Sequence, residues 1–273
     1  DAASVSQLTT IDGTTDATLA ITAVTDNAVN IVAANGTGLS SFVQTNTNVT
    51  VSDAATIAQL TAIDAQATGG TLSYSLMSDT ASNLATNTGT YVKDGLTTVT
   101  VSDAATIAQL TTIDAATDAT LSYSLMSDTA SNLVTNTGTY VKDGLTTVTV
   151  SDAATIAQLT TIDGTTDATL SYSLMSDTAS NLATNTGTYV KDGLTTVTVS
   201  DAATIAQLTT IDAATDATLS YSLMSDTASN LVTNTGTYVK DGLTTVTVSD
   251  AATIAQLTTI DGTTDATLSY SLM

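Results

Sequence analysis

The sequence of 273 residues contains no His, Glu, Arg, Cys, Pro or Trp. Without His and Glu it lacks the usual general bases near neutral pH, and without Cys it lacks a thiol nucleophile and the thiolate ligands of structural zinc sites. Without Arg it lacks the side chain that binds anions in a bidentate manner. We therefore expect that the chain is not an enzyme.

Positive charge is also scarce. All 26 acidic residues are Asp, the only cations are four lysines, and the formal net charge is −22. Nucleic-acid binding depends on Lys and Arg side chains that neutralise phosphates, so this balance predicts no nucleic-acid partner. The acidity is compatible with cation binding, with high-salt surroundings, or with solubility alone.

Long apolar runs are missing as well. No stretch of about 18 or more apolar residues occurs, so we predict no membrane span. The absence of Cys excludes a small secreted domain held together by disulfides. The chain begins at Asp1 without Met and ends at Met273 in the middle of a repeating unit, so we expect a piece of a longer protein.

What the sequence does contain is a tandem repeat. The motif S-D-A-A-T-I recurs at intervals of 49 residues, except for a first interval of 50, and it starts at Ser52, Ser102, Ser151, Ser200 and Ser249. A period of this size is typical of stacked-repeat proteins. We assign a divergent first repeat at residues 1–52, repeats at 53–101, 102–150, 151–199 and 200–248, and a partial repeat at 249–273. The first repeat either caps the stack or is a divergent internal copy.

Each repeat consists of two related halves. Residues 101–105 match residues 126–130, 25 positions later, so the structural period is a coil of about half a repeat. In the first half, alternation of Thr with Val predicts a strand in which Val99 and Val101 point inward. Ser102-Asp103 then predicts the N-cap of a helix that runs to Ile113.

The second half follows the same plan. Its strand places Leu121, Tyr123 and Leu125 inside, and Asp128 predicts the cap of a weaker helical turn. We therefore predict an α/β solenoid of stacked coils, with a parallel β-sheet and short capped helices. The alternative is an all-β solenoid in which residues 107–113 are extended. Parallel strands stack about 4.8 Å apart and helices about 8–10 Å, so alternation of a better with a poorer helix, or curvature, must absorb the difference.

Pairs of aspartates four positions apart follow the first predicted helix of each repeat. Two carboxylates in a turn supply the oxygen ligands that Ca²⁺ prefers, although Asp-Gly and Asp-Ala loops are also ordinary turns and neither an EF-hand loop nor a glycine-rich nonapeptide occurs. We predict calcium, the one cofactor that the sequence suggests, at Asp114, Asp118, Asp163, Asp167, Asp212 and Asp216. Calcium bound there would stiffen the stack by reducing repulsion between carboxylates of successive repeats.

Other recurring side chains have both a structural and a functional interpretation. The outward row of Thr98, Thr100 and Ser102 suits an ordinary solvent-facing strand or an array that binds ice. Tyr140 suits packing at the rim or a platform for carbohydrate. Lys142 is better explained as an exposed lysine that offsets negative charge than as part of a catalytic Ser/Lys dyad, because no motif in the sequence indicates an oxyanion hole.

The motifs V-T-V-S-D-A-A-T-I-A-Q-L-T-T-I-D and Y-S-L-M-S-D-T-A-S-N-L resemble repeats of very large secreted bacterial cell-surface proteins. These Ser-Asp-Thr-Ala-Asn-Leu repeats occur in cyanobacteria and proteobacteria, in proteins described as hemolysin-type, adhesin-like or S-layer-like. The resemblance extends over the whole chain. It implies export by the type I route, folding outside the cell where calcium is abundant, and an extracellular location at the cell surface.

These observations predict a non-catalytic structural module of a surface protein, fibre or surface layer, which acts as a scaffold that sets length. Its expected partners are other copies, joined end to end or side by side. The alternative is an adhesive module for glycan, ice or a host surface. A groove lined by aromatic side chains would favour the adhesive module, and end-to-end stacking would favour the scaffold.

Overall fold

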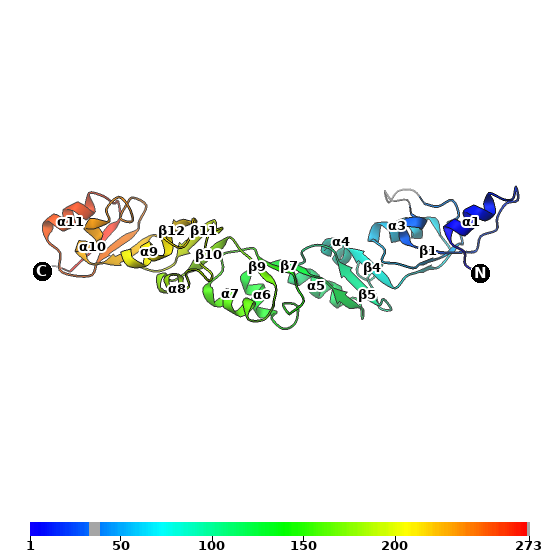
Figure 1. The fold of residues 1–273 in the computed structure, drawn as a ribbon, viewed down its shortest axis with the longest axis horizontal. Helices are drawn as coiled ribbons and strands as arrows, with labels where there is room; N and C mark the ends of the chain where they lie inside the picture. The colour runs from blue at the N-terminus through cyan, green and yellow to red at the C-terminus, as the bar shows by residue number, and fades with distance from the viewer. Residues whose placement is uncertain (33–38, 272–273) are drawn as a thin grey trace. The chain divides into compact units, whose positions relative to one another are not determined.

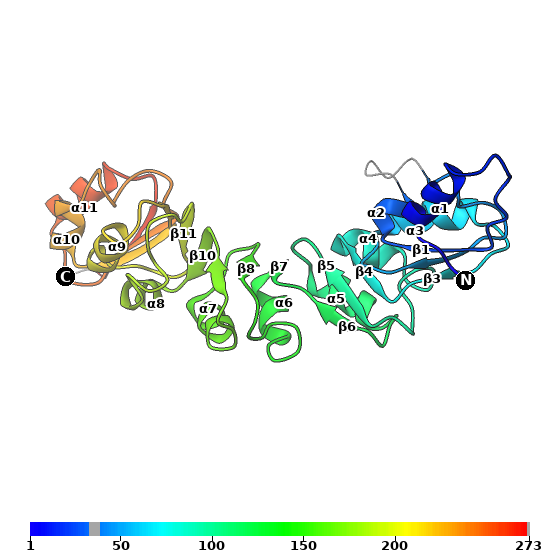
Figure 2. The ribbon, with the colours of Figure 1, turned by 45° about the vertical axis from the view of Figure 1, so that its right-hand side comes forward.

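The computed structural model describes residues 1–32 and 39–271. The chain divides into two compact units, Asp1–Ser127 with Gly144–Thr147 and Asp128–Asp143 with Val148–Met273. Within each unit, short strands and helices alternate along the chain (Figure 1, Figure 2).

The helices repeat with alternating lengths after the first repeat. They are α1 (Val5–Asp12), α2 (Ala28–Ile31), α3 (Ile57–Gln66), α4 (Ala81–Thr86), α5 (Ile107–Asp114), α6 (Ala130–Thr135), α7 (Ile156–Asp163), α8 (Ala179–Thr184), α9 (Ile205–Asp212), α10 (Ala228–Thr233) and α11 (Ile254–Asp261). From α5 to α11, helices of 8 residues alternate with helices of 6 residues.

The strands are short and lie between the helices. They are β1 (Ala23–Asp26), β2 (Asn48–Val51), β3 (Leu72–Ser73), β4 (Leu76–Asp79), β5 (Thr98–Val101), β6 (Thr120–Ser122), β7 (Leu125–Asp128), β8 (Thr147–Val150), β9 (Thr169–Ser171), β10 (Leu174–Asp177), β11 (Thr196–Val199), β12 (Thr218–Ser220), β13 (Leu223–Asp226), β14 (Thr245–Val248) and β15 (Thr267–Ser269).

Strands of successive coils pair in parallel and form sheets of three. In the sheet β10-β11-β12 the inward residues Met175, Val197 and Leu219 are in register, and β13-β14-β15 repeats the arrangement. The first unit contains the sheets β1-β2-β3 and β4-β5-β6. None of these described sheets closes into a barrel. The predicted parallel pairing between coils is confirmed, and the units of strand and helix form a solenoid-like repeat.

The strands do not form one uninterrupted sheet within a unit. β12 and β13 follow each other directly but belong to different sheets, because the backbone leaves strand geometry at Tyr221 and Ser222. The Ser222 carbonyl there accepts hydrogen bonds from both Thr244 N–H (2.7 Å) and Thr245 N–H (3.2 Å). The helices associate in pairs, α8 with α9 and α10 with α11. Interruption of the sheet and pairing of a short helix with a longer one together accommodate the different spacings of strands and helices.

Each longer helix from α3 onward has a threonine as its N-cap, three residues after the aspartate predicted from the sequence. The Oγ1 atom of Thr106 accepts a hydrogen bond from Gln109 N–H (3.2 Å), and the Gln109 Oε1 atom accepts one from Thr106 N–H (2.9 Å). This reciprocal capping box satisfies two backbone donors at the start of α5. The prediction that Ser102-Asp103 caps this helix is therefore wrong. So is the all-β alternative, because residues 107–113 are helical.

The core of each coil is formed by side chains from its helix and its strands. Val99 and Val101, predicted to point inward, are 0% and 5% exposed. The inward phase predicted for the second half is confirmed for Leu121, which lies in register with the inward Val99, and is wrong for Leu125, because Leu125 is half-buried whereas Met126 is fully buried. The reason is the interruption after β6, which restarts the alternation at Leu125. Each fully buried Leu, Ile or Met side chain contributes about 1.5–3 kcal/mol.

A compact loop follows each 6-residue helix. After α8, the Asn185 carbonyl accepts hydrogen bonds from Tyr189 and Val190 N–H, and Gly187 N–H donates to the Val190 carbonyl (2.8 Å). Gly187 has a φ of +82°, which L-residues with a side chain rarely adopt. These hydrogen bonds hold the backbone of the loop at Tyr189.

Candidate functional site

Carboxylates form hydrogen bonds between successive coils. The Asp177 side chain is 8% exposed and accepts from Ile156 N–H in the preceding coil (2.8 Å). Its other oxygen accepts from Thr178 N–H (2.7 Å) and Asn181 Nδ2 (2.8 Å) in its own coil. Because the N–H groups of the first helical turn have no partner within the helix, the carboxylate satisfies a donor that would otherwise be unpaired.

The same contact recurs along the described chain, and we name it the aspartate ladder. Each donor is the first N–H group of a helix, and each acceptor is an aspartate in the next coil, at 2.7–2.9 Å: Val5 to Asp26, Ala28 to Asp53, Ile57 to Asp79, Ala81 to Asp103, Ala130 to Asp152, Ile156 to Asp177, Ala179 to Asp201, Ile205 to Asp226 and Ala228 to Asp250. An anionic oxygen is also favoured at the positive end of a helix.

The aspartate ladder corrects one prediction from the sequence. Asp103 was expected to bind the N–H groups of the helix that follows it. Its carboxylate instead accepts from Ala81 N–H at the start of α4, in the preceding coil (2.7 Å). The aspartate therefore joins neighbours instead of capping its own helix, so each coil depends on the next one for its helix start.

Hydrogen bonding changes the acidity of one member of the aspartate ladder. Burial raises the pKa of Asp26, but hydrogen bonds from the Asn30 side chain and from Asn27 and Val5 N–H outweigh it. The net pKa of Asp26 lies below its ordinary value of 3.8. Its carboxylate is therefore ionised, as the contact with Val5 requires.

The six aspartates predicted to bind calcium occupy two kinds of position. Asp114, Asp163 and Asp212 are the last residues of α5, α7 and α9, whereas Asp118, Asp167 and Asp216 lie in the loops before β6, β9 and β12.

Their side chains have partners within the protein. The Asp163 and Asp212 Oδ2 atoms accept from the hydroxyls of Tyr189 and Tyr238 (both 3.3 Å). The Oδ1 atoms of Asp118 and Asp216 accept from N–H groups of glycines in the preceding coil, Gly95 (2.9 Å) and Gly193 (3.0 Å). Asp167 donates its N–H to Asp143 Oδ1 (3.2 Å). Among the described residues no three acidic side chains form a group able to hold a metal ion. Calcium binding by the pairs stays a prediction.

Lysine and tyrosine form a cluster that sequence reasoning missed. The Lys191 ammonium lies over the Tyr172 ring, 5.6 Å from its centroid, and the Tyr172 hydroxyl donates to the Tyr189 carbonyl (3.0 Å). The Tyr189 hydroxyl in turn donates to Asp163, so the cluster joins two coils. Tyr221 with Lys240 and Tyr74 with Lys93 repeat the cation–π contact at 5.6 and 5.7 Å. The signal in the sequence was the constant separation of 19 positions between each tyrosine and its lysine.

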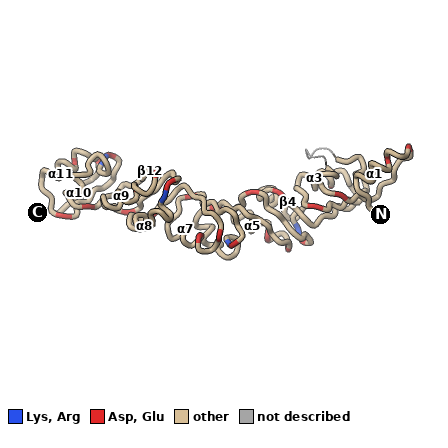
Figure 3. Tube along the Cα trace, viewed as in Figure 1, with Lys and Arg blue, Asp and Glu red and all other residues tan. Residues whose placement is uncertain are grey.

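The cluster also changes the acidity of the tyrosine. Burial, followed by the negative charges that Tyr189 and Asp163 can carry, raises the pKa of Tyr172 to about 12. The lysine ammonium then packs over a neutral ring, and such a cation–π contact contributes about 0.5–1 kcal/mol at exposed sites. Lysines are few whereas aspartates are spread along the chain (Figure 3), and the 26 aspartates far outnumber the four lysines.

The outward face of the sheet is mixed in composition. In the register of β4-β5-β6, Thr98 lies between Leu76 and Thr120, and Thr100 lies between Ser78 and Ser122. The rows therefore combine Leu, Ser and Thr and do not form a uniform threonine array.

Comparison of the chain with protein-family models, with curated proteins and with solved structures gave no match. None of the helices in the described part of the chain has the length and apolar character needed to cross a membrane.

Proposed function

We propose that the chain is a non-catalytic structural module of an extracellular surface protein, fibre or surface layer. Its coils stack as an α/β solenoid, and the number of repeats sets the length of the scaffold. Further copies join it end to end or side by side.

The observation that supports this proposal most directly is the aspartate ladder. An active site usually occurs once in a chain. The Asp177 and Asp226 carboxylates instead make the same contact in successive repeats. Both are also nearly buried, 8% exposed, so their carboxylates are used between coils. Because acidic side chains form identical contacts between neighbouring coils, each repeat is held by its neighbours. Such a chain can be lengthened by the addition of repeats.

Deletion of whole repeats tests the proposal. Removal of residues 151–199 takes out one complete repeat and leaves the sequence on both sides in phase. We expect the variant to stay folded and its maximum dimension, measured by small-angle X-ray scattering, to fall by about 10–20 Å, the rise of two coils at strand or helix spacing. Duplication of the same segment should add an equal length.

A half-repeat deletion is the matched control. Removal of residues 151–175 would place two 6-residue helices, α6 and α8, in adjacent coils, so we expect lower stability. If deletion and duplication of whole repeats changed the maximum dimension by unequal amounts or not at all, the proposed scaffold would be wrong.

A further inference from the structure

The turns that precede β5, β8, β11 and β14 each contain the pair Asp-Gly. The four pairs are Asp94-Gly95, Asp143-Gly144, Asp192-Gly193 and Asp241-Gly242, and both residues are exposed in each of them. The φ angles of these glycines lie between +89° and +91°, which a residue with a side chain rarely adopts. Because glycine has no Cβ atom, its backbone nitrogen is also less shielded from the side chain of the residue before it.

This pair is prone to a rearrangement of the backbone. The glycine nitrogen attacks the carboxyl carbon of the aspartate side chain, a C–N bond forms, and the amide proton and the carboxyl hydroxyl leave together as water. The product is a cyclic succinimide. Water then opens the ring at either carbonyl, which restores aspartate or leaves isoaspartate, whose backbone runs through the side chain and is longer by a CH₂ group. Water is the only other reactant.

The next coil holds the glycine nitrogen in these turns. The glycine N–H donates to the Oδ1 atom of an aspartate 23 positions later, at 2.9–3.0 Å: Gly95 to Asp118, Gly193 to Asp216 and Gly242 to Asp265. In the third repeat the next coil also contacts the pair, because Asp167 N–H donates to Asp143 Oδ1 (3.2 Å). A charge-assisted hydrogen bond keeps the proton on the nitrogen and fixes the direction of the peptide group, so the nitrogen cannot turn toward the preceding carboxyl group.

An Asp-Gly pair at the end of a helix provides a comparison. Gly164 follows Asp163 at the end of α7, and its N–H donates to the Thr160 carbonyl of the same helix (3.0 Å). Its backbone is right-handed helical, with a φ of −73° and a ψ of −3°. This nitrogen is therefore held locally, and the contact does not depend on a neighbouring coil.

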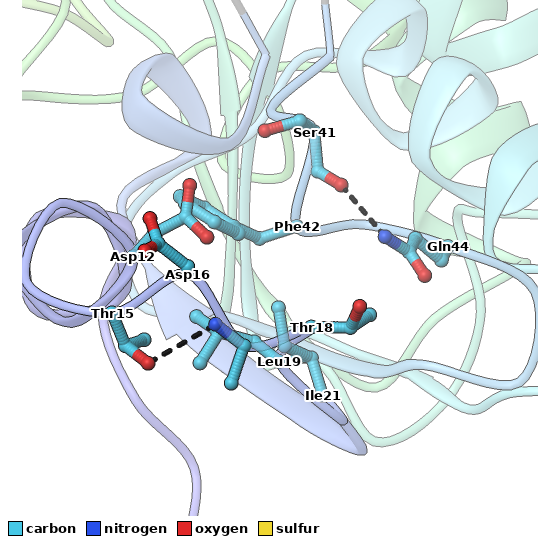
Figure 4. Close-up of a pocket in the computed structure, with 10 residues that line it drawn as sticks. Asp12, Thr15, Asp16, Thr18, Leu19, Ile21, Ser41, Phe42 and Gln44 are labelled. Atoms are coloured by element: carbon cyan, nitrogen blue, oxygen red, sulfur yellow. Dashed lines mark hydrogen bonds between the residues drawn. The ribbon is translucent and has the colours of Figure 1, made fainter.

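The first repeat lacks both partners of the contact between coils. Its turn reads Gln44-Thr45-Asn46 where later repeats read Lys-Asp-Gly, and the Gln44 side chain donates to the Ser41 carbonyl (3.1 Å; Figure 4). Asn46 stands in the position of the glycine, with a φ of +66°, and its N–H donates to the Thr68 backbone carbonyl (2.9 Å). Between these two described coils, the carboxylate acceptor is missing together with the Asp-Gly pair.

We propose that the exposed Asp-Gly turns are sites of succinimide and isoaspartate formation, and that the carboxylate of the next coil suppresses this reaction by holding the glycine N–H group. The turns and their protecting aspartates are Asp94-Gly95 with Asp118, Asp192-Gly193 with Asp216, and Asp241-Gly242 with Asp265. Stacking of the coils thus protects the backbone against covalent change, and a coil whose neighbour opens exposes its turn to it.

The substitution Asp216→Ala tests the proposal within a single chain. The tryptic peptides 94–142 and 192–240 have the same sequence in the unmodified chain, so this substitution distinguishes by mass the peptide that contains Asp192. Asp94, whose acceptor Asp118 is intact, is then the matched control. The variant is incubated at neutral pH in ¹⁸O-labelled water, because each opening of a succinimide adds labelled oxygen. Mass spectrometry of peptide fragments, after digestion in ordinary water, measures the label and the isoaspartate at each turn.

We expect Asp192 to take up label about tenfold faster than Asp94 in this variant, the factor that corresponds to about 1.4 kcal/mol for the lost hydrogen bond. Asp118→Ala should reverse the ratio, whereas the pair Asp163-Gly164 should be unaffected by either change. Asp216→Asn keeps a neutral acceptor of the same shape and should have a smaller effect.

Two results would overturn the proposal. One is equal uptake of label at Asp94 and Asp192 in both alanine variants, since general loosening of the fold would affect the two turns alike. The other is slower uptake beside the substitution, since it would show that the Asp216 carboxylate removes the amide proton and promotes the reaction.

Discussion

Replacement of Asp177 by Asn isolates one contact of the aspartate ladder. The amide has the shape of the carboxylate, so its oxygen can still accept from Thr178 N–H and from the Asn181 side chain. Its NH₂ group would then face the Ile156 N–H, which now donates to the carboxylate at 2.8 Å. Two donors would oppose each other at the start of α7.

The expected loss follows from the burial of this contact. A hydrogen bond to a charged group contributes about 1.5–3 kcal/mol, and a buried N–H group without a partner costs about 1–3 kcal/mol. Because these terms overlap, we expect Asp177→Asn to lower stability by about 3 kcal/mol. Since each coil interacts mainly with its neighbours, the loss should be concentrated near α7.

Amide hydrogen exchange measures this local effect better than a global melting curve, because long repeat arrays depart from two-state unfolding. The exchange rate of the Ile156 amide should rise about 100-fold, the factor that corresponds to about 3 kcal/mol. Asp192→Asn is the matched control, because Asp192 is exposed in its turn, and it should change stability by less than about 0.5 kcal/mol. Equal effects of the two substitutions would refute the role assigned to the aspartate ladder.

Three further predictions concern other contacts. The pKa of Tyr172 is about 12 in the folded chain and about 10 when exposed, so its contribution to stability is complete below pH 10 and is lost as the pH rises towards 12. Tyr172→Phe should reduce this loss of stability in unfolding curves recorded between pH 9 and 12. An unchanged pH dependence would contradict this prediction. Thr155→Ala removes the cap of α7 and should lower stability by about 1 kcal/mol in urea unfolding, whereas Thr155→Ser should be nearly neutral; equal losses would argue against the capping box. If the pairs such as Asp163 with Asp167 bind calcium, a chelator should lower the melting temperature, and no shift on chelation would remove the calcium prediction.

The repeat and its coil period could be predicted from the sequence because identical motifs recur at fixed intervals. The inward direction of Val99 and Val101 followed from strict alternation. The start of α5 is also marked in the sequence, since Thr106 and Gln109 have the spacing of a capping box, but the Ser-Asp pair just before them is an equally good N-cap signal in the sequence alone.

Contacts between coils were harder to predict. The partner of Asp103 lies in another coil, at Ala81. No local sequence pattern indicates which backbone N–H group a carboxylate binds. The interruption at Tyr123 and Ser124 also carries no local signal, since L-S-Y-S-L alternates as regularly as the strand before it. The break depends on how strands and helices of adjacent coils fit together, which is a property of the stack.

The aspartate ladder has a direction. Every carboxylate reaches back to the helix of the coil before it, as Asp201 does to Ala179 and Asp177 to Ile156. A chain that folds progressively from its N-terminus would therefore complete each helix only when the following coil arrives. Shortening from the C-terminal side would take away the aspartate that holds the start of the last remaining helix. Shortening from the N-terminal side would remove no such aspartate from the helices that remain, so the two ends of such a stack should differ in their resistance to proteases.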